Sequence, residues 1–258
     1  MSRADSSDEK PLPAPMHILG LVTSTNDLAK EALSRGASHG ESFLASGQTM
    51  GRGRTGKRWH SPLEQHLYLS LVLKLDWPIV QIAQLTLAAG VAVAQVLRDL
   101  HGLEVKLKWP NDVQVGDRKL AGILCEGVIR GEELLGAVVG LGLNLNGDAS
   151  AFPEPLRPLV TTMEASTGQS LSEAQRVALA AAFVERLVTL VDGQSADSVL
   201  SAIRRDWRSW CNLPRRVRLP DGREGDAVAI DEQGRLVVAM GVSTEAVESA
   251  TLEWLPSA

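Results

Sequence analysis

The chain has 258 residues and a mass of 27.6 kDa, enough for one large domain with a small appendage and for a continuous core without disulfide bonds. Its 26 Lys and Arg against 31 Asp and Glu leave a net charge of −5, which argues against a protein that mainly coats nucleic acid. Only two cysteines occur, far apart in the sequence, so a disulfide framework is excluded and a cytoplasmic location is expected.

The N-terminal part predicts a tail, a helix and two strands around a long loop. Residues 1–15 are polar and proline-rich and are expected to be disordered, without the apolar segment of a signal peptide. Apolar spacing predicts a helix over 24–36 and strands over 42–46 and 67–73. The glycine-rich stretch 47–59 has no periodicity and predicts a loop.

The middle of the chain predicts one helix followed by a run of strands. The helix covers 78–100 and has a buried alanine-rich face. No apolar run of the sequence reaches the roughly 20 residues that span a bilayer, so no membrane association is expected. Strands are predicted over 105–109, 112–115, 120–129 and 134–140, and their short turns favour antiparallel pairing.

Two further helices are predicted over 172–191 and 195–210, with Ser170 and Glu173 as a capping box for the first. The β-branched, glycine-punctuated sequence of 213–258 predicts a small SH3-like β-barrel.

The fold expected from these elements is α+β: a mixed or antiparallel sheet with helices on one face, plus the C-terminal β module. The expected division is a tail over 1–15, a main domain over 16–212 and the β module over 213–258.

A cationic glycine loop is the strongest local signal. Arg52, Arg54, Lys57 and Arg58 lie within seven positions, interleaved with glycines that let backbone N–H groups approach a ligand. The guanidinium fork matches a phosphate or a carboxylate, so the pattern predicts an anion-binding loop. It is not a Walker A motif and fits the dinucleotide fingerprint poorly, and a solvated basic loop is the alternative.

Two further segments carry polar groups at strand ends. In the sequence Lys-Trp-Pro-Asn-Asp at 108–112, Asp112 is a candidate to hold Mg²⁺ or to orient an incoming amine, with Lys119 a hairpin away. The stretch 140–146 alternates small and large residues, so Gly140 and Gly142 indicate a flat face against which a ligand can lie. A structural turn, a solvent-exposed lysine and tight helix packing are the alternatives.

Together and in this order, these motifs resemble those of the biotin–protein ligases. The matching segments are GRGRTGKRW (51–59), KWPND (108–112), KLAGIL (119–124) and GLGLNLN (140–146), with Ser-Thr-Asn at 24–26 ahead of them. The resemblance extends from about residue 16 to the C-terminus. It implies a class II synthetase-like catalytic domain, in the ligase-only form without an N-terminal helix-turn-helix and without a DNA partner.

The resemblance also implies a reaction. Biotin and ATP, with Mg²⁺, form biotinyl-5′-adenylate and pyrophosphate, and a lysine of the biotin carboxyl carrier protein of acetyl-CoA carboxylase then takes the biotin. A homodimer is a further possibility that the resemblance raises.

The resemblance implies site residues position by position. The implied catalytic residues are Arg52, Lys119 and Asp112, with Asp112 also as the Mg²⁺ ligand. The residues implied to contact biotin or its adenylate come from the matching segments and, for Gln48, from the start of the predicted loop 47–59: Ser24, Thr25, Asn26, Gln48, Gly51, Arg52, Gly53, Arg54, Trp59, Asn111, Lys119, Gly122, Gly140, Gly142 and Asn144.

Three other functions stay open from the sequence. A lipoate–protein ligase shares the implied fold, and a sensor that binds biotin or the adenylate without catalysis would use the same pocket. A nucleic-acid-binding module is the third, but the acidic balance and the lack of interleaved aromatic residues disfavour it.

Overall fold

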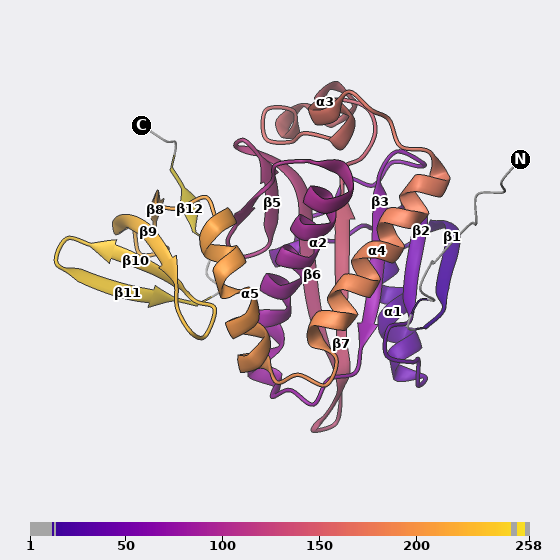
Figure 1. Ribbon diagram of the computed structural model, residues 1–258, viewed down its shortest axis with the longest axis horizontal. Coiled ribbons are helices and arrows are strands. Elements are labelled where there is room, and N and C mark those ends of the chain that lie inside the picture. The colour runs from indigo at the N-terminus through magenta and orange to yellow at the C-terminus, as the bar shows by residue number, and fades with distance from the viewer. Residues whose placement is uncertain (1–11, 13, 249–251, 256–258) are drawn as a thin grey trace, which may run out of the picture.

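A seven-stranded mixed sheet forms the centre of the molecule, with the strand order β1-β2-β3-β7-β6-β5-β4 (Figure 1). The computed structural model describes residues 12, 14–248 and 252–255. Only β1 and β2 are parallel neighbours, and the other pairs are antiparallel. The strands are β1 Met16–Val22, β2 Ser42–Gln48, β3 Leu67–Leu73, β4 Lys106–Lys108, β5 Asp112–Val115, β6 Arg118–Arg130 and β7 Glu133–Leu143.

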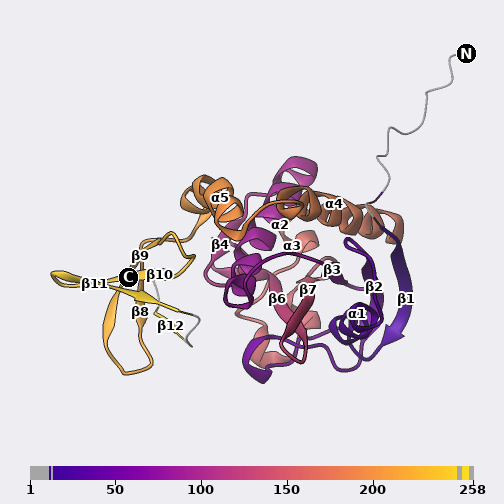
Figure 2. The same ribbon diagram turned by 90° about the horizontal axis from the view of Figure 1, so that it is seen from below.

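Helices cover both faces of this sheet, as Figure 2 shows. The long helices α2 (Leu85–His101), α4 (Glu173–Val191) and α5 (Ala196–Trp210) pack on one face and enclose the larger core, as expected. Helix α1 (Thr25–Ser34) packs on the other face against β3 and β7. Every residue of β3 is buried, because the strand has helices on both sides. The predicted α+β class is confirmed, with α1 as an addition on the second face.

Most predicted elements form close to their predicted bounds, and the differences have local causes. Strand β1 was not predicted. The segment 78–100 begins as a 3₁₀ helix, η2 (Ile79–Gln84), and becomes α-helical only at Leu85. Strand β7 ends at Leu143, so the predicted alternation does not continue through 144–146. There the Asn144 backbone N–H still donates to the Leu120 carbonyl of β6, while the Asn144 side-chain amide donates to the carbonyl oxygen of Thr161.

The helical stretch Ile79–His101 is long and apolar enough by length and composition to cross a membrane, contrary to the expectation from the sequence. More than half of it is buried inside the protein. It packs against α4, α5 and β6, so its apolar character is that of a core helix.

A second, five-stranded antiparallel sheet follows α5, with the order β11-β10-β9-β8-β12. It lies beside α5 and is yellow in Figure 1. Its strands are β8 Arg215–Arg218, β9 Glu224–Ile230, β10 Leu236–Met240, β11 Ser243–Val247 and β12 Glu253–Trp254. This β-rich part agrees with the predicted SH3-like module, while the domain division itself stays a prediction. The predicted tail lies outside the described residues except for 12, 14 and 15.

The remaining elements are short and lie in the connections: η1 Arg54–Gly56, η3 Ala149–Ala151, η4 Glu154–Leu156 and α3 Met163–Thr167.

Helix α4 begins with a capping box, but not the predicted one. Ser172 is the N-cap residue, its Oγ accepts a hydrogen bond from the Gln175 backbone, and the Gln175 side chain accepts one from the Ser172 backbone. The prediction of Ser170 and Glu173 was therefore wrong by two residues. Both serines are followed three positions later by a suitable partner, and only the structure shows where the helix begins.

We expect Ser172→Ala to destabilise the protein by about 1 kcal/mol, because it leaves a helix N-terminal N–H without its acceptor. For a chain of this size that lowers Tm by about 2–4 °C in a thermal melt. Ser170→Ala is the matched control and leaves Tm unchanged. Equal shifts for both variants would contradict the placement of the cap.

Candidate active site

A cavity of about 370 Å³ opens over the glycine-rich part of β6 and β7. The loop after β2, the 108–112 turn and the segment after β7 form its walls, and Leu252 and Trp254 of the second sheet complete them. Most of the residues predicted from the sequence line this cavity: Asn26, Gln48, Arg52, Gly53, Arg54, Trp59, Asn111, Asp112, Lys119, Gly122, Gly140, Gly142 and Asn144. The structure thus brings together segments that lie more than a hundred residues apart.

The floor of the cavity is flat because glycines face each other across two strands. Gly122 of β6 pairs in register with Gly142 of β7, and the Trp59 indole lies over both. A Cβ atom at either glycine would overlap the indole ring. The ring packs against the backbone here only because side chains are absent. The sequence predicted such a close approach for a ligand, and in the structure the Trp59 ring occupies it.

Gly140 makes room for a different side chain. A Cβ atom there would overlap the amide of Asn26, which reaches the sheet from the start of α1. The Asn26 Oδ1 accepts a hydrogen bond from Ser70 Oγ at 2.6 Å, and its Nδ2 donates to Glu126 Oε2 at 2.8 Å. The amide of Asn26 is therefore fixed in one orientation at the cavity wall.

Three predicted residues do not line the cavity but support residues that do. Ser24 is buried at the N-cap of α1. Thr25 donates from its backbone N–H and its hydroxyl to Gln48 Oε1, at 2.9 and 3.2 Å, and so orients the Gln48 amide. Gly51 lets the loop turn tightly against Ser61 and the Trp59 carbonyl, where a Cβ atom would not fit.

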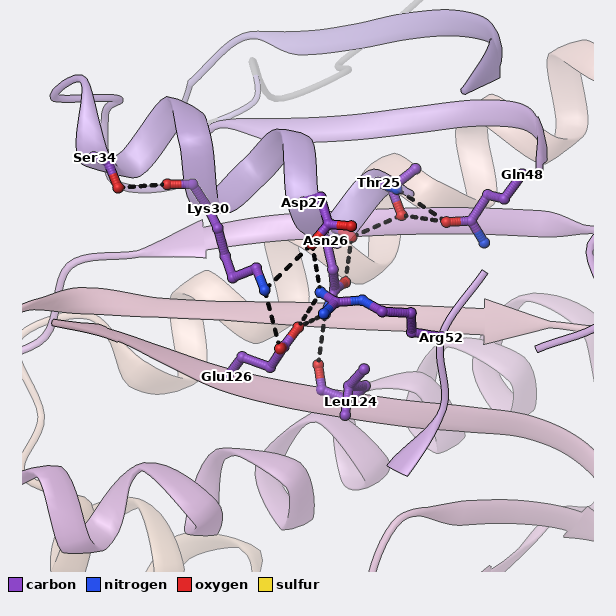
Figure 3. A network of polar contacts seen from close by, with 10 residues as sticks. Thr25, Asn26, Asp27, Lys30, Ser34, Gln48, Arg52, Leu124 and Glu126 are labelled. Atoms are coloured by element: carbon purple, nitrogen blue, oxygen red, sulfur yellow. Dashed lines mark hydrogen bonds and ion pairs between the residues drawn. The ribbon is translucent and has the colours of Figure 1, made fainter. Parts of the chain in front are cut away.

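Arg52 anchors the cationic loop to two other elements (Figure 3). Its Nη2 lies 2.8 Å from Asp27 Oδ1 on α1 and 2.8 Å from Glu126 Oε2 on β6. Lys30 joins the same network, 3.1 Å from Glu126 and 3.3 Å from Asp27. Carboxylates from α1 and β6 thus balance the charge of the guanidinium and fix its position.

Asp27, Lys30 and Glu126 were not predicted as site residues. For Glu126 a signal was available, because side chains alternate along a strand and Glu126 follows Gly122 by four positions in β6. It therefore lies on the same face of the sheet as the cavity floor.

Lys119 and Asp112 form an ion pair at the other end of the floor. Their Nζ and Oδ1 atoms are 2.5 Å apart, and Lys119 Nζ lies 5.2 Å from the Trp59 ring centre. Asn111 beside them accepts a hydrogen bond from Arg54 Nη1 at 3.3 Å and donates one to the Ile123 carbonyl. The predicted catalytic pair is therefore in direct contact.

The cavity carries a surplus of positive charge. Its lining cations are Arg52, Arg54, Lys57, Arg58, Lys108 and Lys119, and Asp112 is the one carboxylate that lines it within the described residues. Burial lowers the pKa of Arg54 and of Lys108, and the nearby Asp112 carboxylate opposes the shift in both. Such a cavity favours a ligand with several negative charges.

The described residues contain no group of three or more His, Cys, Asp or Glu that could hold a metal ion by itself. Asp112 and Asn111 offer one carboxylate and one amide oxygen. This small oxygen set fits Mg²⁺, which keeps several waters and takes its other ligands from substrate phosphates.

An apolar wall completes the cavity and was not predicted. Phe152, Leu156 and Val160 come from the segment after β7, and backbone hydrogen bonds between Lys119 and residues 159–161 hold that segment in place. Phe152 stacks on buried His66, with ring centres 5.2 Å apart. Burial lowers the His66 pKa to about 4, so this ring is neutral at pH 7.

Comparison with known proteins places this site in a family. A profile described as the Biotin/lipoate A/B protein ligase family matches residues 19–144. The Biotin--[acetyl-CoA-carboxylase] ligase of Mycobacterium tuberculosis is 32% identical over 241 residues, covering 90% of this chain and 86% of that protein. The chain belongs to the biotin protein ligase family.

Other members of the biotin protein ligase family agree in sequence and in fold. The Biotin--[acetyl-CoA-carboxylase] ligase of Paracoccus denitrificans is 30% identical, covering 90% of this chain and 98% of that protein. The biotin protein ligase from Aquifex aeolicus, solved in complex with biotin and ATP, superposes with a TM-score of 0.75 at 25% identity. That comparison covers 94% of this chain and 99% of the Aquifex chain.

We expect Glu126→Gln to loosen the cationic loop of this biotin protein ligase, because Arg52 and Lys30 then lose a charged acceptor. Trypsin cleaves after the four cations of this loop, so the rate of loop cleavage in limited proteolysis measures the loosening. We expect the closed loop to lose about 1 kcal/mol of stabilisation, a figure that allows for solvent screening. This loss corresponds to roughly fivefold faster cleavage.

Glu133→Gln, an exposed carboxylate at the β6–β7 turn, is the matched control and leaves the rate unchanged. Equal cleavage rates for Glu126→Gln and the wild-type protein would contradict the anchoring role of Glu126.

Proposed function

We propose that this enzyme is an ATP-dependent biotin–protein ligase that forms biotinyl-5′-adenylate and transfers biotin to a lysine of the biotin carboxyl carrier protein of acetyl-CoA carboxylase. The observation that carries the proposal is the cavity with six cations and one carboxylate above a glycine floor. The names of the relatives support the choice of biotin and of this carrier.

The first half-reaction joins two anions that repel each other. A biotin carboxylate oxygen attacks the α-phosphorus of ATP, the bond to the bridging oxygen breaks, and pyrophosphate leaves. Arg54 and Lys119 both line the cavity beside Asn111 and Asp112, so they compensate the charge on both anions and hold them together. Arg52, released in part from Asp27 and Glu126, adds a third cation. These cationic side chains can therefore accelerate the reaction by positioning the two substrates and by stabilising negative charge.

The second half-reaction needs an unprotonated amine next to the adenylate. The ε-amino nitrogen of the acceptor lysine attacks the carbonyl carbon, the bond to the phosphate oxygen breaks, and AMP leaves. Asp112 is the carboxylate in the cavity, so it is the group that orients the amine and takes its proton. Its partner Lys119 faces the leaving phosphate.

Asp112 and Asn111 are the residues that would hold Mg²⁺, which when bound offsets part of the negative charge on the nucleotide phosphates. The glycine-rich loop, anchored through Arg52, covers the cavity and keeps water from the adenylate.

Biotin is favoured over lipoate by the polar groups at the α1 end of the floor. The amides of Asn26 and Gln48 line the cavity there, and they offer donors and acceptors that suit a ureido ring. The dithiolane ring of lipoate has no N–H or carbonyl group, so it would gain no polar contact with these amides, which keep their partners Ser70, Glu126, Thr25 and Ser61.

We also propose that the protein is cytoplasmic and does not bind DNA. The acidic net charge supports the absence of a DNA partner, and the two free cysteines support a cytoplasmic location. A homodimer is also proposed, for which β1 provides an edge strand of the large sheet.

The test is ATP–pyrophosphate exchange with the purified protein and Mg²⁺. We expect exchange that depends on biotin, and transfer of labelled biotin when a biotin carboxyl carrier domain is added. Exchange with lipoate and not with biotin would select the lipoate ligase instead. No exchange with either acid, together with tight biotin binding, would indicate a sensor.

We expect Lys119→Ala to lower the rate of biotin-dependent exchange about 100-fold, the order found when one electrostatic donor at a reacting centre is removed. Lys106→Ala on β4, an exposed lysine, is the matched control and retains the full rate. Circular dichroism checks that both variants fold. A rate within a few-fold of the wild type for Lys119→Ala would contradict the role assigned to this lysine.

A further inference from the structure

The C-terminal strand β12 brings an aromatic side chain to the cavity. Trp254 lines the cavity, while its neighbour Glu253 points to Arg218 on β8, with 2.6 Å between Oε2 and Nη1. The Leu255 backbone N–H donates to the Arg216 carbonyl and continues the pairing of β12 with β8. Because side chains alternate along a strand, this pairing directs Trp254 and Glu253 to opposite sides.

Trp254 contacts a lysine of the 108–112 turn. Lys108 Nζ lies 5.5 Å from the Trp254 ring centre, a cation–π distance. Lys108 is half-buried and lines the cavity, and its side-chain ammonium makes no hydrogen bond or ion pair to another residue that the structure describes. Its ammonium therefore keeps three N–H donors for a ligand.

The surroundings of Lys108 make an anionic ligand favourable. Burial is the main cause that lowers the Lys108 pKa, and Arg215 and Lys119 lower it further, while Asp112 raises it. A half-buried cation beside two others gains more from a bound anion than a solvated one does. The ring face of Trp254 compensates part of this charge without using an N–H donor.

The second sheet is held against this turn by further contacts. Trp109, which follows Lys108, donates from Nε1 to the Gly234 carbonyl at 3.0 Å. Arg215 at the start of β8 lies 3.0 Å from Asp117, next to the strands that carry Lys119 and Asp112. Trp254 thus reaches Lys108 from a sheet that two contacts, Trp109–Gly234 and Arg215–Asp117, hold against the cavity wall.

We propose that Trp254 is a positioning residue that holds the Lys108 ammonium toward the phosphate chain of the nucleotide. The inference rests on the proposed function for the identity of the anion. Of the two substrates, ATP carries several phosphate charges and biotin only one carboxylate, so ATP is the anion that Lys108 would contact. It makes β12 a part of the nucleotide site, although β12 lies at the other end of the chain from the cationic loop.

The test measures ATP binding directly, by calorimetry with Mg²⁺, so that it does not depend on turnover. We expect Trp254→Ala to raise the Kd for ATP about tenfold, the order of one partly desolvated cation–π contact, and to leave the Kd for biotin unchanged. Trp254→Phe keeps an aromatic face and restores most of the affinity. Glu253→Ala, whose side chain points away, is the matched control and binds ATP as the wild type does.

A double variant tests whether Trp254 acts through Lys108. If it does, adding Trp254→Ala to Lys108→Ala raises the Kd for ATP little further. If the two residues act independently, the fold-increases in Kd of the single variants multiply. Unchanged ATP affinity in Trp254→Ala, multiplied losses in the double variant, or equal losses for biotin and ATP would each overturn the proposal. Absent biotin-dependent exchange with normal ATP binding in the wild type would instead refute the proposed function, and the calorimetry would still decide the role of Trp254.

Discussion

The site depends on how the protein balances the positive charge that it gathers around one cavity. Within the part of the chain that the structure describes, six cationic side chains line the cavity with a single carboxylate, Asp112, which pairs with Lys119. Arg52 is balanced from outside the cavity, by Asp27 on α1 and Glu126 on β6. Charges this close would repel one another strongly without such partners. An anionic ligand can replace these carboxylates, so the arrangement suits both the folded protein and the chemistry proposed for it.

The glycine floor gives this charge a defined surface. Gly122 and Gly142 pair in register, and the strand β3 that supports β7 is buried on both faces. The strands therefore hold the floor, while the loop that carries Arg52 contributes a wall that Asp27 and Glu126 anchor. Asn26 links the two, since it fills the space that Gly140 leaves and contacts the same Glu126 that binds Arg52.

The second sheet is part of the same construction. Trp109 and Lys108, neighbours in one turn, both contact it, through Gly234 and Trp254 respectively. If the second sheet only covered the end of the large sheet, none of its side chains would need to line the cavity. It contributes Leu252 and Trp254 to the lining, so an apolar surface lies next to the cationic Lys108.

The sequence by itself determined the α+β class and most element bounds, because periodicity is a local property, and most of the site residues that its motifs indicated line the cavity. The strand 67–73 was predicted to the residue, and the glycine loop and Asp112 were predicted as site residues. Only the tertiary structure decided which carboxylates hold Arg52, which serine caps α4, and that Phe152 and Trp254 line the cavity. The partners of Arg52 and the placement of Phe152 and Trp254 depend on strand register and on contacts between distant segments. The start of α4 is a choice between two similar local patterns, which only the folded helix decides.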